Sequence, residues 1–145
     1  MEIIKNKKAY FDYEILAKYD AGLMLHGHEV KAIRAKKVNL KSGYVSIKNN
    51  EAWLENVQID PYQPANQPEE NRKRKRKLLL NRREIDKITP QSETPGITLV
   101  PLKIFSQNNR IKIQIGICRG KKKHDKRATI KKRELDRELK KKFKL

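Results

Sequence analysis

The side chains of this sequence that are best suited to chemistry are cations, and they gather in two places. Residues 119–145 carry 14 Lys or Arg against 4 acids, and Arg72–Lys77 is a run of six basic residues. The other stretches lie closer to balance, with 10 bases and 10 acids in residues 1–71 and 6 and 3 in residues 78–118. Such uneven charge, +19 in total, repels itself in the free chain. A polyanion offsets this repulsion, and the backbone of nucleic acid is the commonest one.

Catalytic and metal chemistry find little support in the sequence. His26 and His28 are two apart, which on a strand would place both on one face like a pair of metal ligands, but no third ligand cluster accompanies them. The sequence has no nucleophile elbow, no phosphate-cradling glycine loop and no paired-carboxylate motif. We therefore expect a binding protein and not an enzyme, with no metal and no cofactor.

Length and composition set the class of protein. A chain of 145 residues forms one domain plus extensions. No apolar run approaches the ~20 residues of a membrane span, and neither basic block adjoins a broad apolar stripe that would favour a lipid surface. The N-terminus has no apolar stretch long enough for a signal peptide, and a lone Cys118 fits a reducing compartment. These features predict a cytoplasmic monomer without membrane partners.

Alternating apolar residues predict several short antiparallel strands. Ile111, Ile113, Ile115 and Ile117 alternate with smaller or polar residues, which is typical of a strand with one buried face. The predicted strands are 10–16 and 22–25 around a turn at 19–21, 44–48 and 52–59 around a turn at 49–51, and 97–105 and 110–117 around a turn at 107–109. Trp53 is expected in the core, and Pro101 at an edge or bulge because it cannot donate a ladder hydrogen bond.

Two short helices are expected in the connections. One covers His28–Lys37, with Val30 and Ile33 buried and Glu29, Lys31 and Arg34 exposed. The other covers Leu78–Ile88 and ends before Pro90, after a proline-containing loop at 61–71.

These elements predict a mainly β protein with short helices. Closure removes exposed sheet edges, so we expect an OB-like closed antiparallel barrel with a basic C-terminal tail. The expected domains are an N-terminal extension at 1–9, an RNA-binding barrel with inserted helices at 10–120, and a basic tail at 121–145.

Four motifs in a fixed order carry a family resemblance. They are Gly27-His-Glu-Val-Lys-Ala-Ile-Arg-Ala-Lys-Lys-Val-Asn-Leu40, Arg74-Lys-Arg-Lys-Leu-Leu-Leu-Asn-Arg-Arg-Glu-Ile-Asp86, Thr98-Leu-Val-Pro-Leu-Lys103 and Arg119-Gly-Lys-Lys-Lys-His-Asp-Lys-Arg127. Together they resemble the SsrA-binding protein (SmpB) family from about Tyr10 to the end of the chain. Lys36 departs from the glycine usual in that family, a change that a helix would tolerate.

The resemblance implies both a fold and a function. It implies an OB-type barrel that binds the tRNA-like domain of transfer-messenger RNA and delivers it to stalled ribosomes for trans-translation. It also implies a tail, disordered when free, that becomes helical in the empty decoding site and messenger channel of the small subunit, against its ribosomal RNA.

Candidate site residues follow from the basic blocks and the motifs together. Those expected to contact RNA are Glu29, Lys31, Arg34, Arg74, Lys75, Arg76, Lys77, Lys121, Lys122 and Lys123. Those expected in the ribosome-binding tail are Asp125, Lys126, Arg127, Lys131, Lys132 and Arg133. Clustered like charges repel one another and the apolar stripe of the tail is thin, so the free tail is expected to be disordered.

Other interpretations remain open at this point. The charged face of the first helix could be merely solvated, and the tail could be a permanently docked helix. The chain could also be a ribosomal or RNA-chaperone protein held permanently in an RNA assembly. A nuclease or RNA-modifying enzyme is the third class, and it lacks its active-site residues here.

Overall fold

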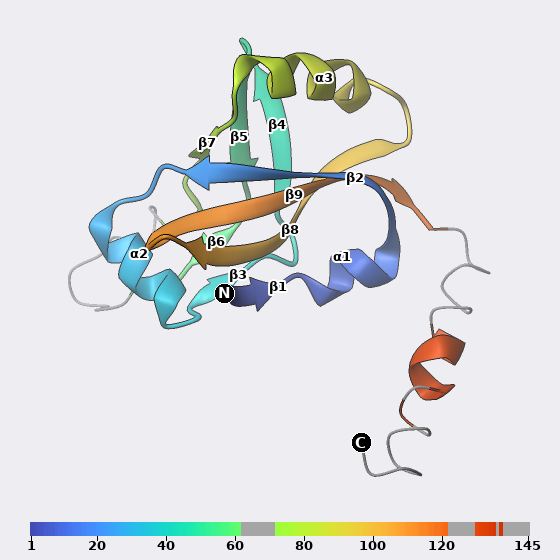
Figure 1. The fold of residues 1–145 in the computed structure, drawn as a ribbon, viewed down its shortest axis with the longest axis horizontal. Coiled ribbons are helices and arrows are strands. Elements are labelled where there is room, and N and C mark those ends of the chain that lie inside the picture. Colours follow the sequence, from blue (N-terminus) through green and yellow to red (C-terminus); the bar gives the residue numbers. More distant parts are fainter. Residues whose placement is uncertain (62–71, 122–129, 136, 138–145) are drawn as a thin grey trace.

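The fold is a strongly coiled antiparallel sheet with short helices at its ends (Figure 1). The computed structural model describes residues 1–61, 72–121, 130–135 and 137. Its strands are β1 (Glu2–Lys5), β2 (Tyr13–Leu23), β3 (Val38–Asn39), β4 (Tyr44–Lys48), β5 (Glu51–Glu55), β6 (Gln58–Ile59), β7 (Arg76–Leu79), β8 (Ile97–Gln107) and β9 (Arg110–Gly120). The helices that border the sheet are α1 (Lys7–Asp12), α2 (Gly27–Arg34) and α3 (Arg82–Ser92).

In the described part of the chain, seven strands form one sheet in the order β1-β8-β9-β2-β7-β5-β4, and β3 pairs with β6 in a second, two-stranded sheet. The mainly β, antiparallel class is therefore confirmed, but the expected closed barrel is wrong: the large sheet ends at β1 and β4. β4 packs across β8 without a shared ladder. At this crossing a Cβ added to Gly43 would lie 2.5 Å from Val57 Cγ2 and 3.0 Å from Pro101 Cγ. Only glycine allows these segments of the protein to pack so closely.

The β4–β5 and β8–β9 hairpins were predicted correctly, and their turns show why. Asn49, Asn50, Asn108 and Asn109 all have positive φ, between 51° and 62°, which Asn tolerates better than most residues. Pro101 lies beside a register shift in the β8–β9 ladder, which confirms the predicted bulge. The 52–59 strand is instead two strands, because Asn56 has φ 59° and turns the chain into β6.

The N-terminal half differs most from the prediction. Residues 10–12 belong to α1, capped by the Asn6 side chain, and β2 then runs without the predicted turn. β9 supplies the reason: it pairs with β2 through Tyr19, Asp20 and Ala21, and Gln114 donates a hydrogen bond to Asp20 at 3.2 Å. The first nine residues, expected to be an extension, contribute β1 to the sheet beside β8.

The second predicted helix begins later than expected. Leu78 and Leu79 lie in β7, where Leu78 pairs with Ala52 on one side and Leu23 on the other. α3 begins after Asn81, whose side chain forms a reciprocal capping box with Glu84. Pro90 lies inside the helix, in its exposed last turn, where water can bind the carbonyl that Pro90 leaves without a donor.

The main core gathers inward-facing side chains of the coiled sheet with Ala32 and Ile33 of α2 and Ile88 of α3. Its fully buried side chains include Ile33, Leu54, Ile104, Ile113 and Ile115. Trp53, predicted in this core, is only partly buried on the outer face of β5, because Ala52 and Leu54 take the inward positions of that strand. Cys118 is buried and free, and burial raises the pKa of its thiol to about 11, so the thiol stays protonated.

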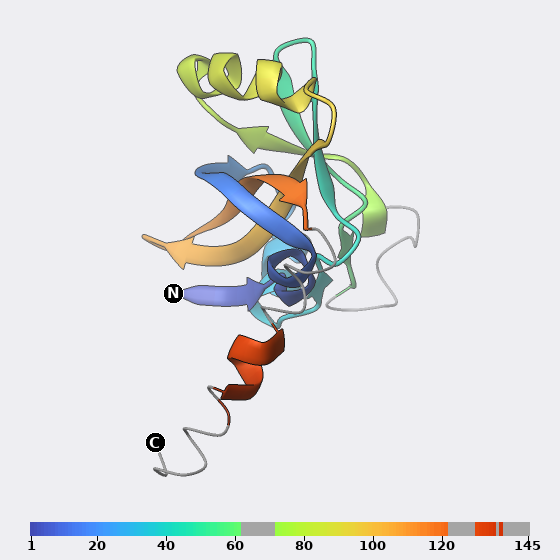
Figure 2. The same ribbon diagram turned by 90° about the vertical axis from the view of Figure 1, so that its right-hand side faces the viewer.

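In both ribbon views the N-terminal strand β1 lies along the lower side of the sheet (Figures 1 and 2). Among the described residues, no helix has the length and hydropathy of a membrane crossing. Residues 130–135 and 137 are helical. Most of the predicted tail lies outside the described residues, so its ordering on the ribosome stays a prediction.

Candidate nucleic-acid interface

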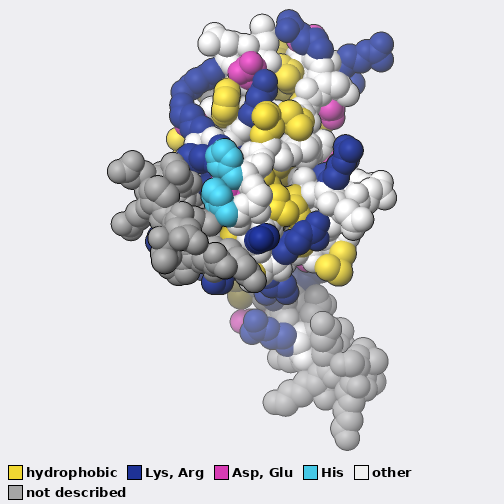
Figure 3. Space-filling model, turned by 90° about the vertical axis from the view of Figure 1, so that its left-hand side faces the viewer, with side chains coloured by type: hydrophobic (Ala, Val, Ile, Leu, Met, Phe, Trp, Pro, Cys, Tyr) yellow, Lys and Arg dark blue, Asp and Glu magenta, His cyan; other side chains and the backbone are white. Residues whose placement is uncertain are grey.

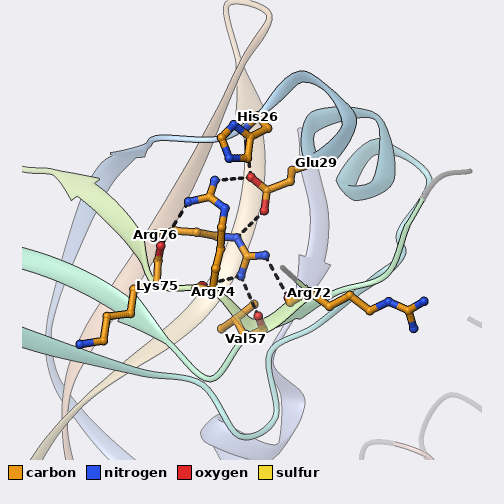
Figure 4. Close-up of polar contacts among 7 residues, drawn as sticks. All are labelled: His26, Glu29, Val57, Arg72, Arg74, Lys75 and Arg76. Atoms are coloured by element: carbon orange, nitrogen blue, oxygen red, sulfur yellow. Dashed lines mark hydrogen bonds and ion pairs between the residues drawn. The ribbon is translucent and has the colours of Figure 1, made fainter. Parts of the chain in front are cut away.

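Glu29 is the centre of a buried ionic network and does not lie on an exposed face (Figure 4). Only 2% of the residue is exposed. One carboxylate oxygen accepts hydrogen bonds from the His26 backbone N–H at 2.9 Å and from the Arg74 guanidinium. The other accepts from Arg76 Nε at 2.7 Å. The expectation of an exposed Glu29 is therefore wrong. Both oxygens of its carboxylate already accept hydrogen bonds from groups within the protein.

The network decides the charge state of Glu29. Burial opposes ionisation, but the His26 N–H and the Arg74 and Arg76 guanidiniums outweigh it, so the pKa of Glu29 lies below its ordinary value. Sequence periodicity missed this role because the buried face of α2 is centred differently: Glu29, Ala32 and Ile33, spaced i, i+3, i+4, are all buried on one side of the helix. Glu29 at the third helical position also closes the capping box of α2.

Arg76 is the partner that ties the basic run to the fold. Its side chain is fully buried. The guanidinium donates to the carbonyls of Val57 at 2.8 Å, Arg74 at 3.1 Å and Arg72 at 2.9 Å, as well as to Glu29 (Figure 4). These bonds hold the chain as it enters β7. The prediction that Arg76 contacts phosphate is wrong, because burial keeps it from any external ligand.

Three further cations of the run, Arg74, Lys75 and Lys77, are paired but accessible. Arg74 keeps 27% of its side chain exposed beside Glu29. The Lys75 Nζ lies 3.5 Å from Glu55 Oε1, and the Lys77 Nζ lies 3.4 Å from Glu51 Oε1. Ser46 donates a hydrogen bond to Glu55 and, with Lys75 nearby, lowers the pKa of that carboxyl. Ion pairs this exposed exchange readily with water or phosphate, so Lys75 and Lys77 keep their place as candidate contacts.

The other predicted body residues lie on the surface. Lys31 and Arg34 are exposed on α2, and Arg34 donates to the Asn109 carbonyl at 3.2 Å in the β8–β9 turn. Lys121 is partly buried and donates to the Tyr10 carbonyl at 3.1 Å. Lys122 and Lys123 lie outside the described residues, as do Asp125, Lys126 and Arg127.

The described part of the tail is an exposed basic helix. Lys131, Lys132 and Arg133 are all exposed. The Arg133 guanidinium lies 5.5 Å from the centre of the Phe11 ring, which joins the tail helix to α1 through a cation–π contact.

A hollow at the α2 end of the sheet was missed from sequence. It measures about 440 Å³ and is lined in part by Leu79, which is 53% exposed; Met24, equally exposed, follows the lining residue Leu23 in the chain. Apolar and basic residues share its lining: Gly22, Leu23, Val30, Leu79, Asn109, Arg110, Ile111 and Lys112. Figure 3 shows basic side chains around the apolar groups of this face. Such a surface suits bases and phosphates together, and only the tertiary pairing of β2 with β7 and β9 creates it.

The two histidines lie side by side on the same face (Figure 3). Their ring centres are 5.4 Å apart in a stacked arrangement. Within the described ranges, no group of three or more His, Cys, Asp or Glu side chains could hold a metal ion. The expected absence of a metal stays a prediction.

Comparisons with known proteins agree with one another. Residues 3–145 match the family model described as SmpB protein. An SsrA-binding protein of Streptococcus mutans is 46% identical over 98% of this chain and 92% of its own length, and one of Gloeothece citriformis is 50% identical over 94% and 89%.

A solved structure points to the same family. A chain of "tmRNA-SmpB: a journey to the center of the bacterial ribosome" is 40% identical, covers 85% of this chain and 87% of its own, and superposes with a TM-score of 0.72. Both the family match and these identities extend over nearly the whole sequence, so this chain belongs to the SmpB protein family.

Proposed function

We propose that this chain binds the tRNA-like domain of transfer-messenger RNA and delivers it to stalled ribosomes for trans-translation. The observation that carries the proposal is the family match from residue 3 to residue 145, which includes the basic tail as well as the sheet. The relatives are named for binding SsrA, and the solved neighbour is a tmRNA–SmpB complex of the bacterial ribosome.

In this proposal the sheet is an OB-type scaffold that presents cations to folded RNA. Lys31 and Arg34 on α2, with Arg110 and Lys112 across the hollow, form one basic rim around an apolar floor. Arg74, Lys75, Lys77 and Lys121–Lys123 extend the contacts along the backbone. Phosphate contacts of this kind position an RNA, while the exposed Leu79 and Met24 offer apolar contact to bases.

The tail has a separate task in the proposal. Asp125, Lys126, Arg127, Lys131, Lys132 and Arg133 occupy the empty decoding site and messenger channel, where ribosomal RNA neutralises their charge. The protein works as a binding adaptor in the cytoplasm and performs no chemical step.

The RNA that accompanies the protein in cells tests the proposal. The full chain is purified at moderate salt from cells that carry transfer-messenger RNA, and the bound RNA is sequenced. We expect one dominant species, transfer-messenger RNA, in about equal molar amount to the protein. Bulk ribosomal RNA at fixed stoichiometry, without that species, would instead identify a permanent ribosomal protein and overturn the proposal.

A further inference from the structure

In the folded protein, acids from the first half of the chain form ion pairs with cations of the basic run. Three acids from the first 71 residues, Glu29, Glu51 and Glu55, form ion pairs with Arg74, Arg76, Lys77 and Lys75. The run thus loses much of its free charge. The same pairs take three acids away from the lysines of the first 71 residues, a stretch whose charges balance in the sequence.

Four of these lysines come together around Asn6, between β1, α1 and the approach to β4. Two grooves of about 300 and 320 Å³ meet there. Lys8 and Lys41 line both grooves, and Lys5 and Lys7 line one of them. All four side chains are exposed. In the described part of the chain, no carboxylate forms an ion pair with Lys7, Lys8 or Lys41.

Asn6 gives this lysine cluster a rigid base. The residue is buried, and its backbone N–H donates to the Leu102 carbonyl at 2.7 Å. Its side-chain amide donates to the carbonyls of Pro101 at 2.9 Å and Leu40 at 3.2 Å. Asn6 thereby joins β1, β8 and the segment before β4, which fixes the backbones that carry Lys5, Lys7, Lys8 and Lys41 relative to one another.

We propose that this cluster, Lys5, Lys7, Lys8 and Lys41, is a second RNA-binding surface that contacts the phosphate backbone. Lysine is a flexible point charge, which suits sequence-independent contact with phosphates rather than reading of bases. Among the described residues, Asp12 is the one acid that lines the two grooves, so the cluster keeps a positive excess there. The inference rests on the proposed function only in taking RNA as the partner.

The salt dependence of binding tests the cluster. The full chain and the variant Lys8→Gln/Lys41→Gln are titrated with two probes: a transcribed tRNA-like domain and an unrelated RNA hairpin of equal length. Each lost phosphate contact reduces the slope of log K against log salt by about 0.7–0.9. We expect the variant to flatten the slope by about 1.4–1.8 on the tRNA-like domain.

A charge-matched variant separates local contact from general electrostatics. Lys48→Gln/Lys87→Gln removes the same charge at the β4–β5 turn and α3, at the other end of the molecule from α1 (Figures 1 and 2). We expect its slope to match that of the unchanged chain. An unchanged slope for Lys8→Gln/Lys41→Gln, or equal flattening by both variants, would overturn the inference; thermal unfolding verifies that both variants fold.

The two probes keep this result apart from the proposed function. If the unchanged chain binds the tRNA-like domain no more tightly than the hairpin, the proposed function fails. The difference in slope between the two variants, measured on the hairpin, then still decides whether the lysine cluster contacts phosphate.

Discussion

At the scale of single residues, Glu29 stands out in the sequence as a charge of special role, but it was wrongly predicted to be exposed. Its carboxylate joins the start of α2 to two arginines of the basic run. Replacing Glu29 by Gln leaves the fully buried Arg76 without its counter-ion. Because an unpaired buried charge is costly, we expect Glu29→Gln to lower the free energy of unfolding by about 3–5 kcal/mol. Urea denaturation at neutral pH measures the change.

The matched control is Glu51→Gln, which breaks an ion pair of similar type on the surface. Glu51 and Lys77 keep 44% and 37% of their side chains exposed, so the expected change is under about 1 kcal/mol. Equal losses in the two variants would contradict the buried role of Glu29. The pH dependence adds a second check. A lowered pKa stabilises the fold above the ordinary value of 4.5, and that contribution is lost as pH falls through the folded value. Acid should therefore destabilise Glu29→Gln less steeply than the unchanged protein.

The residue types alone could not reveal this arrangement. A run of six basic residues indicates a phosphate surface, and Lys75 and Lys77 remain accessible as predicted. Arg76 has the same character in the sequence, yet β7 turns its side chain inward, where backbone carbonyls of Val57, Arg72 and Arg74 bind it. Which member of such a run is buried depends on the strand register, and the register depends on β5 and β2.

At the scale of elements, the end of α2 explains one departure from the family pattern. Lys36, where the family usually has glycine, has φ 62° and lies beyond the helix, not on it as expected. Its N–H donates to the Ile33 carbonyl and that of Lys37 to the Ala32 carbonyl, which together form a Schellman motif. A side chain in this left-handed conformation costs about 1 kcal/mol. We expect Lys36→Gly to raise the free energy of unfolding by about 0.5–1 kcal/mol, measured by urea denaturation.

The neighbouring position supplies the control for that substitution. Lys37 has no positive φ, so Lys37→Gly gains no relief and adds backbone freedom to the unfolded chain. It should leave stability unchanged or reduced. Stabilisation by both substitutions would point to removal of like charge rather than to backbone geometry.

The elements that sequence predicted well are those whose signal is local. Alternating isoleucines and paired asparagines are sufficient for the β8–β9 hairpin, since both the buried face and the turn are encoded within it. β1, the length of β2, and β7 depend on a partner strand distant in sequence. Leu78 and Leu79 fit a helical pattern equally well until β5 and β2 supply hydrogen bonds on both sides.

At the scale of the whole molecule, charge is divided among a basic rim around the apolar hollow, a lysine cluster around Asn6 and a tail helix. The body holds its cations on a hydrogen-bonded sheet, whereas the described tail helix contacts the body through Arg133 and Phe11. This division predicts that RNA binding and ribosome engagement can be separated by truncation.

A chain that ends after Lys123 tests that separation. It keeps the sheet, the Asn6 cluster and Lys121–Lys123, and it loses Asp125–Arg127 and the exposed tail helix. Long-range attraction falls with the lost charge, so we expect affinity for the tRNA-like domain to weaken by less than about tenfold, or 1.4 kcal/mol. Tagging of stalled chains in a reconstituted translation system should fall to background, because no segment remains to enter the decoding site. Persistent tagging would remove the tail from the mechanism, while parallel loss of RNA binding and tagging would make the tail part of the primary RNA site.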